Sequence, residues 1–291
     1  MKNNVAVSIG SLALIEKADV SCRFFARVFG GIGGRAKNLI SSTKLFIYNR
    51  LDECFATNRL LEGYSPELFS LLGFAKLPGE RSLYRNLERI GKKHEFIIEK
   101  YQRVINEDGL VADKQFIDFS SSYFEGKAKA LGEYGYSRDG QPGKKQLTFG
   151  VCTGINGIPC ALTIQKGNVQ DKAHFRFMLK TSAAVLEKNS LLIFDTGGNT
   201  KENKRLIREK EFHYLTLKAK KVGPYKEFIE LYHQGTKTEF TINDVTYSCA
   251  KLVSEEKNYI LFSEKLKREQ LALKERKFKR ELEKNSGVLK K

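Results

Sequence analysis

Two aspartates, Asp118 and Asp195, have the surroundings best suited to chemistry. Asp118 lies within the apolar stretch QFIDFSSSYFEG (115–126), and Asp195 directly follows the run LLIF (191–194). An unpaired buried carboxylate is costly, so an Asp inside a buried strand needs a hydrogen-bonding partner or a metal ion. If the two strands are neighbours in a sheet, both side chains reach one edge, where they repel one another unless a divalent cation lies between them.

A pair of carboxylates of this kind suits Mg²⁺, which prefers oxygen ligands and is commonly held by one or two carboxylates together with phosphate oxygens. Two such ions about 3.5–4 Å apart activate a nucleophile and stabilise the leaving oxygen in phosphodiester chemistry. The sequence therefore predicts a metal site at Asp118 and Asp195. The alternative is that both acids only cap turns, Asp195 in front of the pair Gly197-Gly198.

Other residue types offer less. The glycine-rich stretch FGGIGGRAK (29–37) lacks the GK[ST] ending of a phosphate-binding loop, so it predicts a turn between helices. The five cysteines form no CxxC pair, which indicates neither a zinc site nor a disulfide framework. The four histidines are scattered and are expected in the core or on the surface, although His174 would approach the acids if its loop folds back.

Alternating strands and helices are expected to position the two aspartates. Apolar or alternating runs predict strands, and a helical spacing predicts helices between them, which indicates an α/β sheet layered by helices. The dipeptide Asn156-Gly157 predicts a hairpin between two of the strands. The expected strands are FIDF, 145–153, 158–167, 190–197 and 212–221, and the expected helices are 174–186 and 199–210.

Residues 1–112 are expected to be mainly helical. A helix over 65–74 and another over 77–105, separated by a Pro-Gly turn, are similar to a helix-turn-helix arrangement. This region has a net charge of +5, and its second helix carries arginines at four-residue steps. These are the candidate DNA-binding residues Arg81, Arg85 and Arg89, and the alternative is a solvated helix face.

The C-terminal part changes character twice. Residues 223–262 alternate as antiparallel strands around the turn INDV, which indicates a β-rich insertion. Residues 263–291 are expected to form a charged helix and tail with a net charge of +6. The expected domains are therefore 1–112, 113–222, 223–262 and 263–291.

The charge of the whole chain indicates its partner. Its 291 residues include 51 Lys+Arg against 34 Asp+Glu, a net charge of +17. A surplus of this size favours a polyanion, with nucleic acid first and an anionic membrane second. We expect no membrane partner, because no apolar run reaches the ~18 residues of a membrane helix. The N-terminus also lacks a signal peptide, so a cytoplasmic protein is expected.

Residues 115–221 resemble the catalytic core of DDE transposases from prokaryotic insertion sequences of the insertion-sequence-four type. DFSSSYF (118–124) is similar to their first motif, an Asp with a small hydroxyl residue two positions on and an aromatic residue six positions on. The stretch 135–168 is similar to their next segment, a basic loop and a hairpin ending in Gly-Asn, with an acid, here Asp171, close behind. LLIFDTGGNTKEN (191–203) is similar to their second-aspartate motif.

The resemblance implies a ribonuclease H-like fold, in which a mixed sheet is flanked by helices, and a nucleoid-associated protein. It implies that Asp118 and Asp195 are catalytic and bind Mg²⁺ (or Mn²⁺) during cleavage and strand transfer at transposon ends. It places residues 113–222 in the catalytic core and 1–112 in a DNA-binding region, with a homodimer acting on double-stranded DNA. Further contacts with DNA phosphates would come from the loop residues Arg138, Lys144 and Lys145.

One departure from the family concerns the third acid. The family has a Glu in a helical motif, Tyr-xx-Arg-xxx-Glu-xxxxxx-Lys, and no such motif follows Asp195. The expectation is a transposase truncated at its C-terminus, in which two carboxylates bind metal weakly and catalyse poorly. Two alternatives remain open. The chain is a non-catalytic DNA-binding remnant that represses a transposon, or it is a host nuclease with a ribonuclease H-like core.

Overall fold

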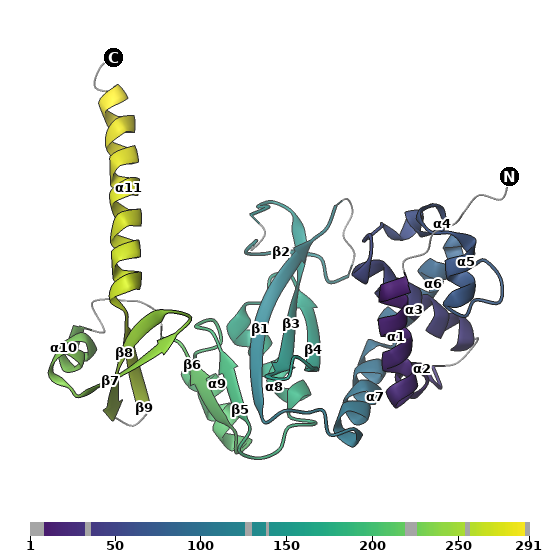
Figure 1. Ribbon diagram of the computed structural model, residues 1–291, viewed down its shortest axis with the longest axis horizontal. Helices are drawn as coiled ribbons and strands as arrows, with labels where there is room; N and C mark the ends of the chain where they lie inside the picture. Colours follow the sequence, from purple (N-terminus) through teal and green to yellow (C-terminus); the bar gives the residue numbers. More distant parts are fainter. Residues whose placement is uncertain are drawn as a thin grey trace. The chain divides into compact units, whose positions relative to one another are not determined.

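A computed structural model describes residues 9–32, 36–125, 130–137, 140–218, 226–253 and 257–288. The chain forms two compact units, Met1–Lys218 and Ala219–Lys291, and each is considered by itself. Figure 1 labels their helices and strands. Within these described ranges, no helix combines the length and apolarity needed to span a bilayer.

The first unit begins with a group of helices around an apolar core. Leu39, Leu45, Leu68 and Leu83 are fully buried in this core. The helix expected over 77–105 is in fact two helices that meet at Lys93, directly after Gly91 and Lys92. Glycine is among the weakest helix formers, which favours a break there. The elements are α1 (Ile9–Cys22), α2 (Phe24–Phe29), α3 (Ala36–Leu51), the 3₁₀ turn η1 (Thr57–Arg59), α4 (Leu60–Gly63), α5 (Pro66–Leu71), α6 (Glu80–Lys92) and α7 (His94–Glu107).

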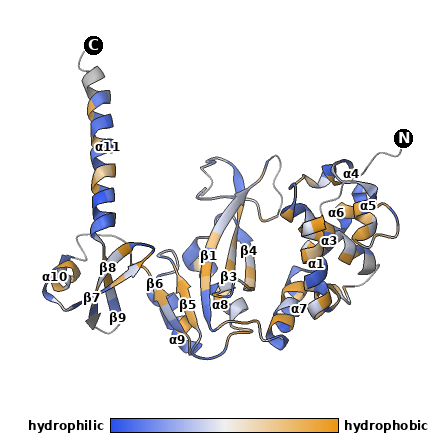
Figure 2. Cartoon of the chain, viewed as in Figure 1, coloured by the Kyte–Doolittle hydropathy of each residue, from blue (hydrophilic) through white to orange (hydrophobic). Residues whose placement is uncertain are grey.

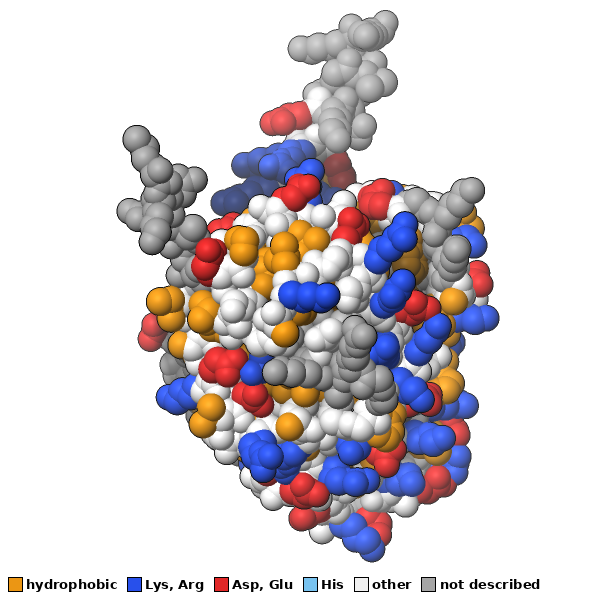
Figure 3. Space-filling model, turned by 90° about the vertical axis from the view of Figure 1, so that its right-hand side faces the viewer, with side chains coloured by type: hydrophobic (Ala, Val, Ile, Leu, Met, Phe, Trp, Pro, Cys, Tyr) orange, Lys and Arg blue, Asp and Glu red, His pale blue; other side chains and the backbone are white. Residues whose placement is uncertain are grey.

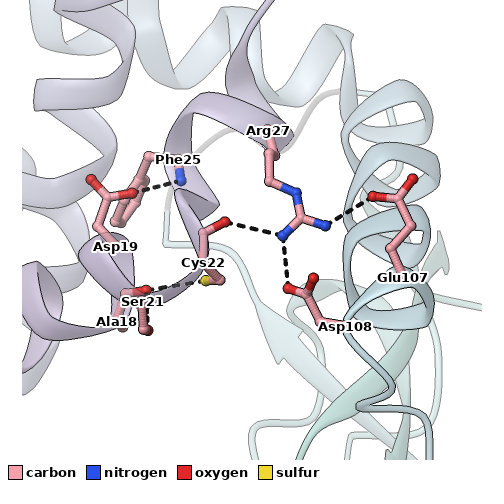
Figure 4. A network of polar contacts seen from close by, with 8 residues as sticks. All are labelled: Ala18, Asp19, Ser21, Cys22, Phe25, Arg27, Glu107 and Asp108. Atoms are coloured by element: carbon pink, nitrogen blue, oxygen red, sulfur yellow. Dashed lines mark hydrogen bonds and ion pairs between the residues drawn. The ribbon is translucent and has the colours of Figure 1, made fainter.

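Arg27 ties α2 to the C-terminal end of α7 (Figure 4). Its guanidinium donates to Asp108 Oδ2 at 2.7 Å, to Glu107 Oε2 at 2.9 Å and to the Cys22 carbonyl at 3.0 Å. These two carboxylates hold the pKa of Arg27 above its ordinary value, mainly through the hydrogen bonds. Since α7 leads into the first strand, this network fixes the point at which the helical region joins the sheet.

The sheet of the first unit is mixed. β1 pairs with β3 in antiparallel and with β5 in parallel orientation, and β5 continues in parallel to β6. β3 and β4 form the hairpin expected at Asn156-Gly157, where Gly157 has a φ of +79°. The strands are β1 (Lys114–Tyr123), β2 (Glu133–Tyr134), β3 (Lys145–Gly154), β4 (Pro159–Lys166), β5 (Leu191–Phe194) and β6 (His213–Thr216). The predicted fold class is confirmed: an α/β protein with a mixed sheet flanked by helices.

One face of this sheet is covered by helices. Ile117 and Phe119 of β1 pack in a core with Phe175 and Met178 of α8 (Asp171–Ser182) and Ile207 of α9 (Lys201–Glu209). The helix expected over 174–186 thus begins three residues earlier, at Asp171, and ends at Ser182.

The opposite face of the sheet is open in the described part of the chain. Alternate β1 residues point to it, so Phe116 is 50% exposed and Asp118 is exposed as well. The sequence leaves open whether Asp118 is buried, and the structure places it on the exposed face of the strand. Successive side chains of a strand point to opposite faces of the sheet. Ile117 and Phe119 therefore point toward the helices, and Asp118 between them points away.

The second unit contains a three-stranded antiparallel sheet in the order β7-β8-β9. Asn243 and Asp244, both with positive φ, form the turn between β7 and β8, as expected for INDV. Helix α10 was not expected in this β-rich stretch. It packs on the sheet through Tyr232, which is buried against Phe262 of β9. In Figure 2 the long helix α11 is mostly hydrophilic. The elements are α10 (Lys226–Gln234), β7 (Lys237–Ile242), β8 (Val245–Val253), β9 (Lys257–Phe262) and α11 (Glu264–Val288).

Candidate active site

The parallel register of β1 and β5 brings Asp118 and Asp195 side by side. Paired residues run from Lys114 with Leu191 to Ile117 with Phe194, and Asp118 and Asp195 each follow the last of these pairs, Asp118 within β1 and Asp195 directly after the end of β5. Neighbouring strands lie about 4.7–4.9 Å apart, so the two backbone positions are adjacent. β1 continues to Tyr123, whereas β5 ends at this point. The acids therefore lie where the sheet loses a strand, next to open space.

Each carboxylate uses one oxygen for a local hydrogen bond. Asp118 Oδ1 accepts from the Phe119 N–H at 2.8 Å, and Asp195 Oδ1 accepts from the Gly197 N–H at 2.9 Å. The Thr216 hydroxyl donates to the Asp195 carbonyl at 3.0 Å and fixes the loop from the side of β6. Asp195 thus caps its turn, as the alternative interpretation required. Both side chains are exposed, so each can offer its second oxygen to a ligand.

A third carboxylate, that of Asp171 at the start of α8, lies close to Asp195. The position that a Cβ atom would take on Gly197 is 2.7 Å from Asp171 Oδ2 and 3.2 Å from Asp195 Oδ1. Both oxygens therefore flank the same glycine. Sequence reasoning placed Asp171 behind the Gly-Asn ending of the hairpin without assigning it to the site. Only the packing of the α8 N-terminus on the loop after β5 shows their proximity.

The two aspartates fit a hard divalent cation such as Mg²⁺. Each has a carboxylate oxygen outside the local hydrogen bonds, and both occupy an exposed edge that phosphate oxygens and water can reach. The part of the chain that the structure describes has no group of three His, Cys, Asp or Glu residues arranged to hold a metal. Two protein carboxylates would therefore hold the ion, with the remaining ligands coming from substrate and solvent.

Gly197→Ala should disturb this site without unfolding the protein. The new methyl group would lie 2.7 Å from Asp171 Oδ2 and 3.2 Å from Asp195 Oδ1, closer than real Cβ contacts in the first case, so the Asp171 side chain or the loop that carries Asp195 must move. We expect weaker Mn²⁺ binding, measured by calorimetry, and slower cleavage of DNA. Gly10→Ala is the control, because its Cβ would meet no atom within 4 Å. Equal Mn²⁺ affinity in the two variants would show that the shift does not reach Asp195.

The other candidate residues lie elsewhere in the first unit. Lys144 forms an ion pair of 2.6 Å with Glu125 and lies over the Tyr123 ring at 4.4 Å. Lys145 lies 5.5 Å from the centre of the Tyr134 ring. Arg138 is outside the described residues. The three remaining candidates, Arg81, Arg85 and Arg89, are all on α6.

His174 does not approach the aspartates. It is fully buried, with Nε2 at 2.8 Å from the Thr163 hydroxyl and Nδ1 at 3.3 Å from the Thr148 hydroxyl. Its ring lies 4.8 Å from that of Phe119, so it is a core residue with both nitrogens at polar groups. Cys152 is also a core residue. A hydrogen bond with Cys160 and burial raise the pKa of its thiol well above the ordinary value, which disfavours the reactive thiolate.

The fold and the site define an α/β protein with paired carboxylates beside the end of a parallel strand. No protein-family model and no curated protein sequence matches the chain. Similar solved structures include the piggyBac transposase synaptic complex with hairpin DNA, at 13% identity and a TM-score of 0.43, covering 86% of this chain. They also include the Mos1 mariner paired-end complex with Mn, at 14% identity and a TM-score of 0.27, covering 80% of this chain and 76% of that one. The chain spans 60% of the length of the piggyBac protein.

Proposed function

We propose that the protein is a DNA transposase that cleaves and joins DNA with a divalent metal, Mg²⁺ or Mn²⁺. The observation that carries the proposal is the register of β1 and β5, which places Asp118 and Asp195 next to each other on an exposed edge. The resemblance of the surrounding motifs to transposases of the insertion-sequence-four type supports the choice of reaction. Ends of an insertion sequence in double-stranded DNA are the proposed substrate.

In this proposal, Asp118 and Asp195 would hold the metal ion beside the scissile phosphate. A bound divalent cation supplies charge stabilisation at the phosphoryl oxygens and lowers the pKa of a coordinated hydroxyl group. The attacking oxygen comes from water during cleavage and from a DNA 3′-hydroxyl during strand transfer. It would lose its proton to solvent and form the new P–O bond in line with the P–O bond that breaks, and the leaving oxygen would take up a proton from solvent. Both carboxylates are exposed and so accessible to a DNA phosphate.

The positive charge of the chain supports DNA as the partner. A net charge of +17 favours phosphate contacts, which release counterions on binding. Arginines of α6 and the loop 136–145 are the proposed contact regions, and a homodimer on paired ends is the proposed assembly. We propose a nucleoid-associated location for the same reason. The proposed phosphate contacts are Arg81, Arg85, Arg89, Arg138, Lys144 and Lys145.

Supercoiled plasmid DNA tests the proposal directly. We expect the protein to nick the plasmid in the presence of Mg²⁺ or Mn²⁺ and not in EDTA, while DNA binding persists in EDTA and weakens steeply with salt. Gel electrophoresis measures nicking, and fluorescence anisotropy of a labelled duplex measures binding. Nicking that is equal with EDTA and with metal would contradict a metal-dependent site.

A second candidate function is DNA binding without catalysis, as in a repressor. It is favoured because the described residues include no group of three His, Cys, Asp or Glu side chains arranged to hold a metal ion. Salt-dependent duplex binding together with no nicking in either metal would select this function over transposition.

A further inference from the structure

Helix α6 has one face fixed in the core of the helical region. Leu83 is fully buried, and the buried Asn86 donates from Nδ2 to the Ser42 hydroxyl at 2.8 Å and to the Asn38 carbonyl at 3.4 Å. Both bonds reach α3. These two hydrogen bonds fix the orientation of α6 about its own axis. They therefore determine which of its side chains face outward.

The outward face combines cationic and aromatic side chains. Residues separated by three and four positions share a face of a helix, and on this face Tyr84 is 46% exposed. Arg89 lies at its margin and is half-buried, so the three arginines singled out in the sequence are not equivalent. The face consists of Arg81, Tyr84, Arg85, Glu88 and Lys92.

Arg81 and Arg85 have no ion-pair partner among the residues that the structure describes. The single acid of the face, Glu88, is already bound by Lys92 at 2.6 Å, and this hydrogen bond lowers the pKa of Glu88. Arg27, in contrast, is neutralised by two carboxylates. The guanidinium groups of Arg81 and Arg85 are therefore available for an anionic partner.

The exposed aromatic ring of this face also suits a nucleic acid. Figure 3 shows the molecule from the end of the first unit that carries the helical region, with many Lys and Arg side chains, interspersed with Asp and Glu, along one side and the lower edge. No described element covers Tyr84, although exposing a large ring to water has no benefit for folding. An aromatic ring between two unpaired arginines matches a surface that contacts both bases and phosphates.

We propose that this face of α6 docks into a groove of double-stranded DNA and that Tyr84 contacts base edges and determines sequence preference. Arg81 and Arg85 hold the helix to the flanking phosphates. All three lie in the N-terminal half of α6, the part of a recognition helix that reaches the bases. The inference rests on the proposed function only in taking DNA as the partner, and it does not depend on Asp118 or Asp195.

Selection from a library of random duplexes tests the proposal, with the full chain in EDTA. We expect the wild-type protein to enrich a defined sequence motif. The Tyr84→Ala variant should enrich a motif in which the base preference is lost at one or more positions. The slope of its log duplex affinity against log salt concentration should be unchanged. Arg81→Ala and Arg85→Ala should each weaken all duplexes and reduce the salt slope by about one.

Phe96→Ala is the matched control, since Phe96 is a partly exposed aromatic residue on the neighbouring helix α7. It should select the wild-type motif. Tyr84→Phe removes only the hydroxyl group, and so distinguishes its contribution to sequence preference from that of the ring. Circular dichroism verifies that each variant is folded. The proposal is overturned if Tyr84→Ala selects the wild-type motif, or if the wild-type protein enriches no motif. Selection of the same motif by Asp118→Asn, without cleavage, keeps this test separate from that of the catalytic site.

Discussion

Replacing Asp118 or Asp195 with asparagine should abolish metal-dependent DNA cleavage and leave the fold unchanged. Metal coordination supplies several kcal/mol of transition-state stabilisation, so the loss should be roughly a hundredfold to a thousandfold or more. Asparagine keeps the carbonyl-type oxygen that accepts from the Phe119 or Gly197 N–H, so the local hydrogen bonds persist. Both side chains are exposed, and stability should change by no more than about 0.5 kcal/mol.

Asp113→Asn is the matched control for this experiment. Asp113 is an exposed acid directly before β1, and its backbone carbonyl accepts a hydrogen bond from Leu191 N–H at 2.7 Å. The control should nick plasmid DNA at the wild-type rate with Mn²⁺. All three variants should bind duplex DNA in EDTA as the wild type does. Cleavage that survives in both Asp118→Asn and Asp195→Asn would show that the catalytic site lies elsewhere.

Local sequence patterns predict much of the first unit. Asn156-Gly157 predicts its hairpin because the turn needs a positive φ, and the apolar run before Asp195 predicts β5. The adjacency of Asp118 and Asp195, which are 77 residues apart in the chain, was a hypothesis that their two strands are neighbours. The backbone pairing of β1 with β5 places them together.

The environment of Asp118 was not predictable from its neighbours. Alternation along β1 separates two faces, but only the position of α8 and α9 decides which face is covered. Phe116 and Ile117 are both apolar, yet the first is half exposed and the second is buried. The contact of Asp171 with the Gly197 loop depends likewise on tertiary packing, which has no signal in either local sequence.

Phe175→Ala should cause the largest loss of stability among the changes considered, about 3–5 kcal/mol. Phe175 is 0% exposed, and its ring centre lies 4.7 Å from that of Phe194 and 6.4 Å from that of Phe119. Truncation removes the ring that fills the space between these two side chains. Denaturation in urea, monitored by circular dichroism, measures the loss. Phe177→Ala is the control on the same helix, since Phe177 is 49% exposed, and it should change stability by about 0.5 kcal/mol or less.

The same substitution tests how the site is positioned. Phe119 directly follows Asp118, and Phe194 directly precedes Asp195, so the Phe175 ring supports the backbone next to both carboxylates. We therefore expect Phe175→Ala to slow Mn²⁺-dependent cleavage even where it remains fully folded, and Phe175→Leu to have a smaller effect on both quantities. If stability fell while cleavage by the folded protein stayed at the wild-type rate, the pairing of β1 with β5 alone would suffice to position Asp118 and Asp195. Loss of both would show that the aromatic core beneath the sheet is part of what holds the two carboxylates in place.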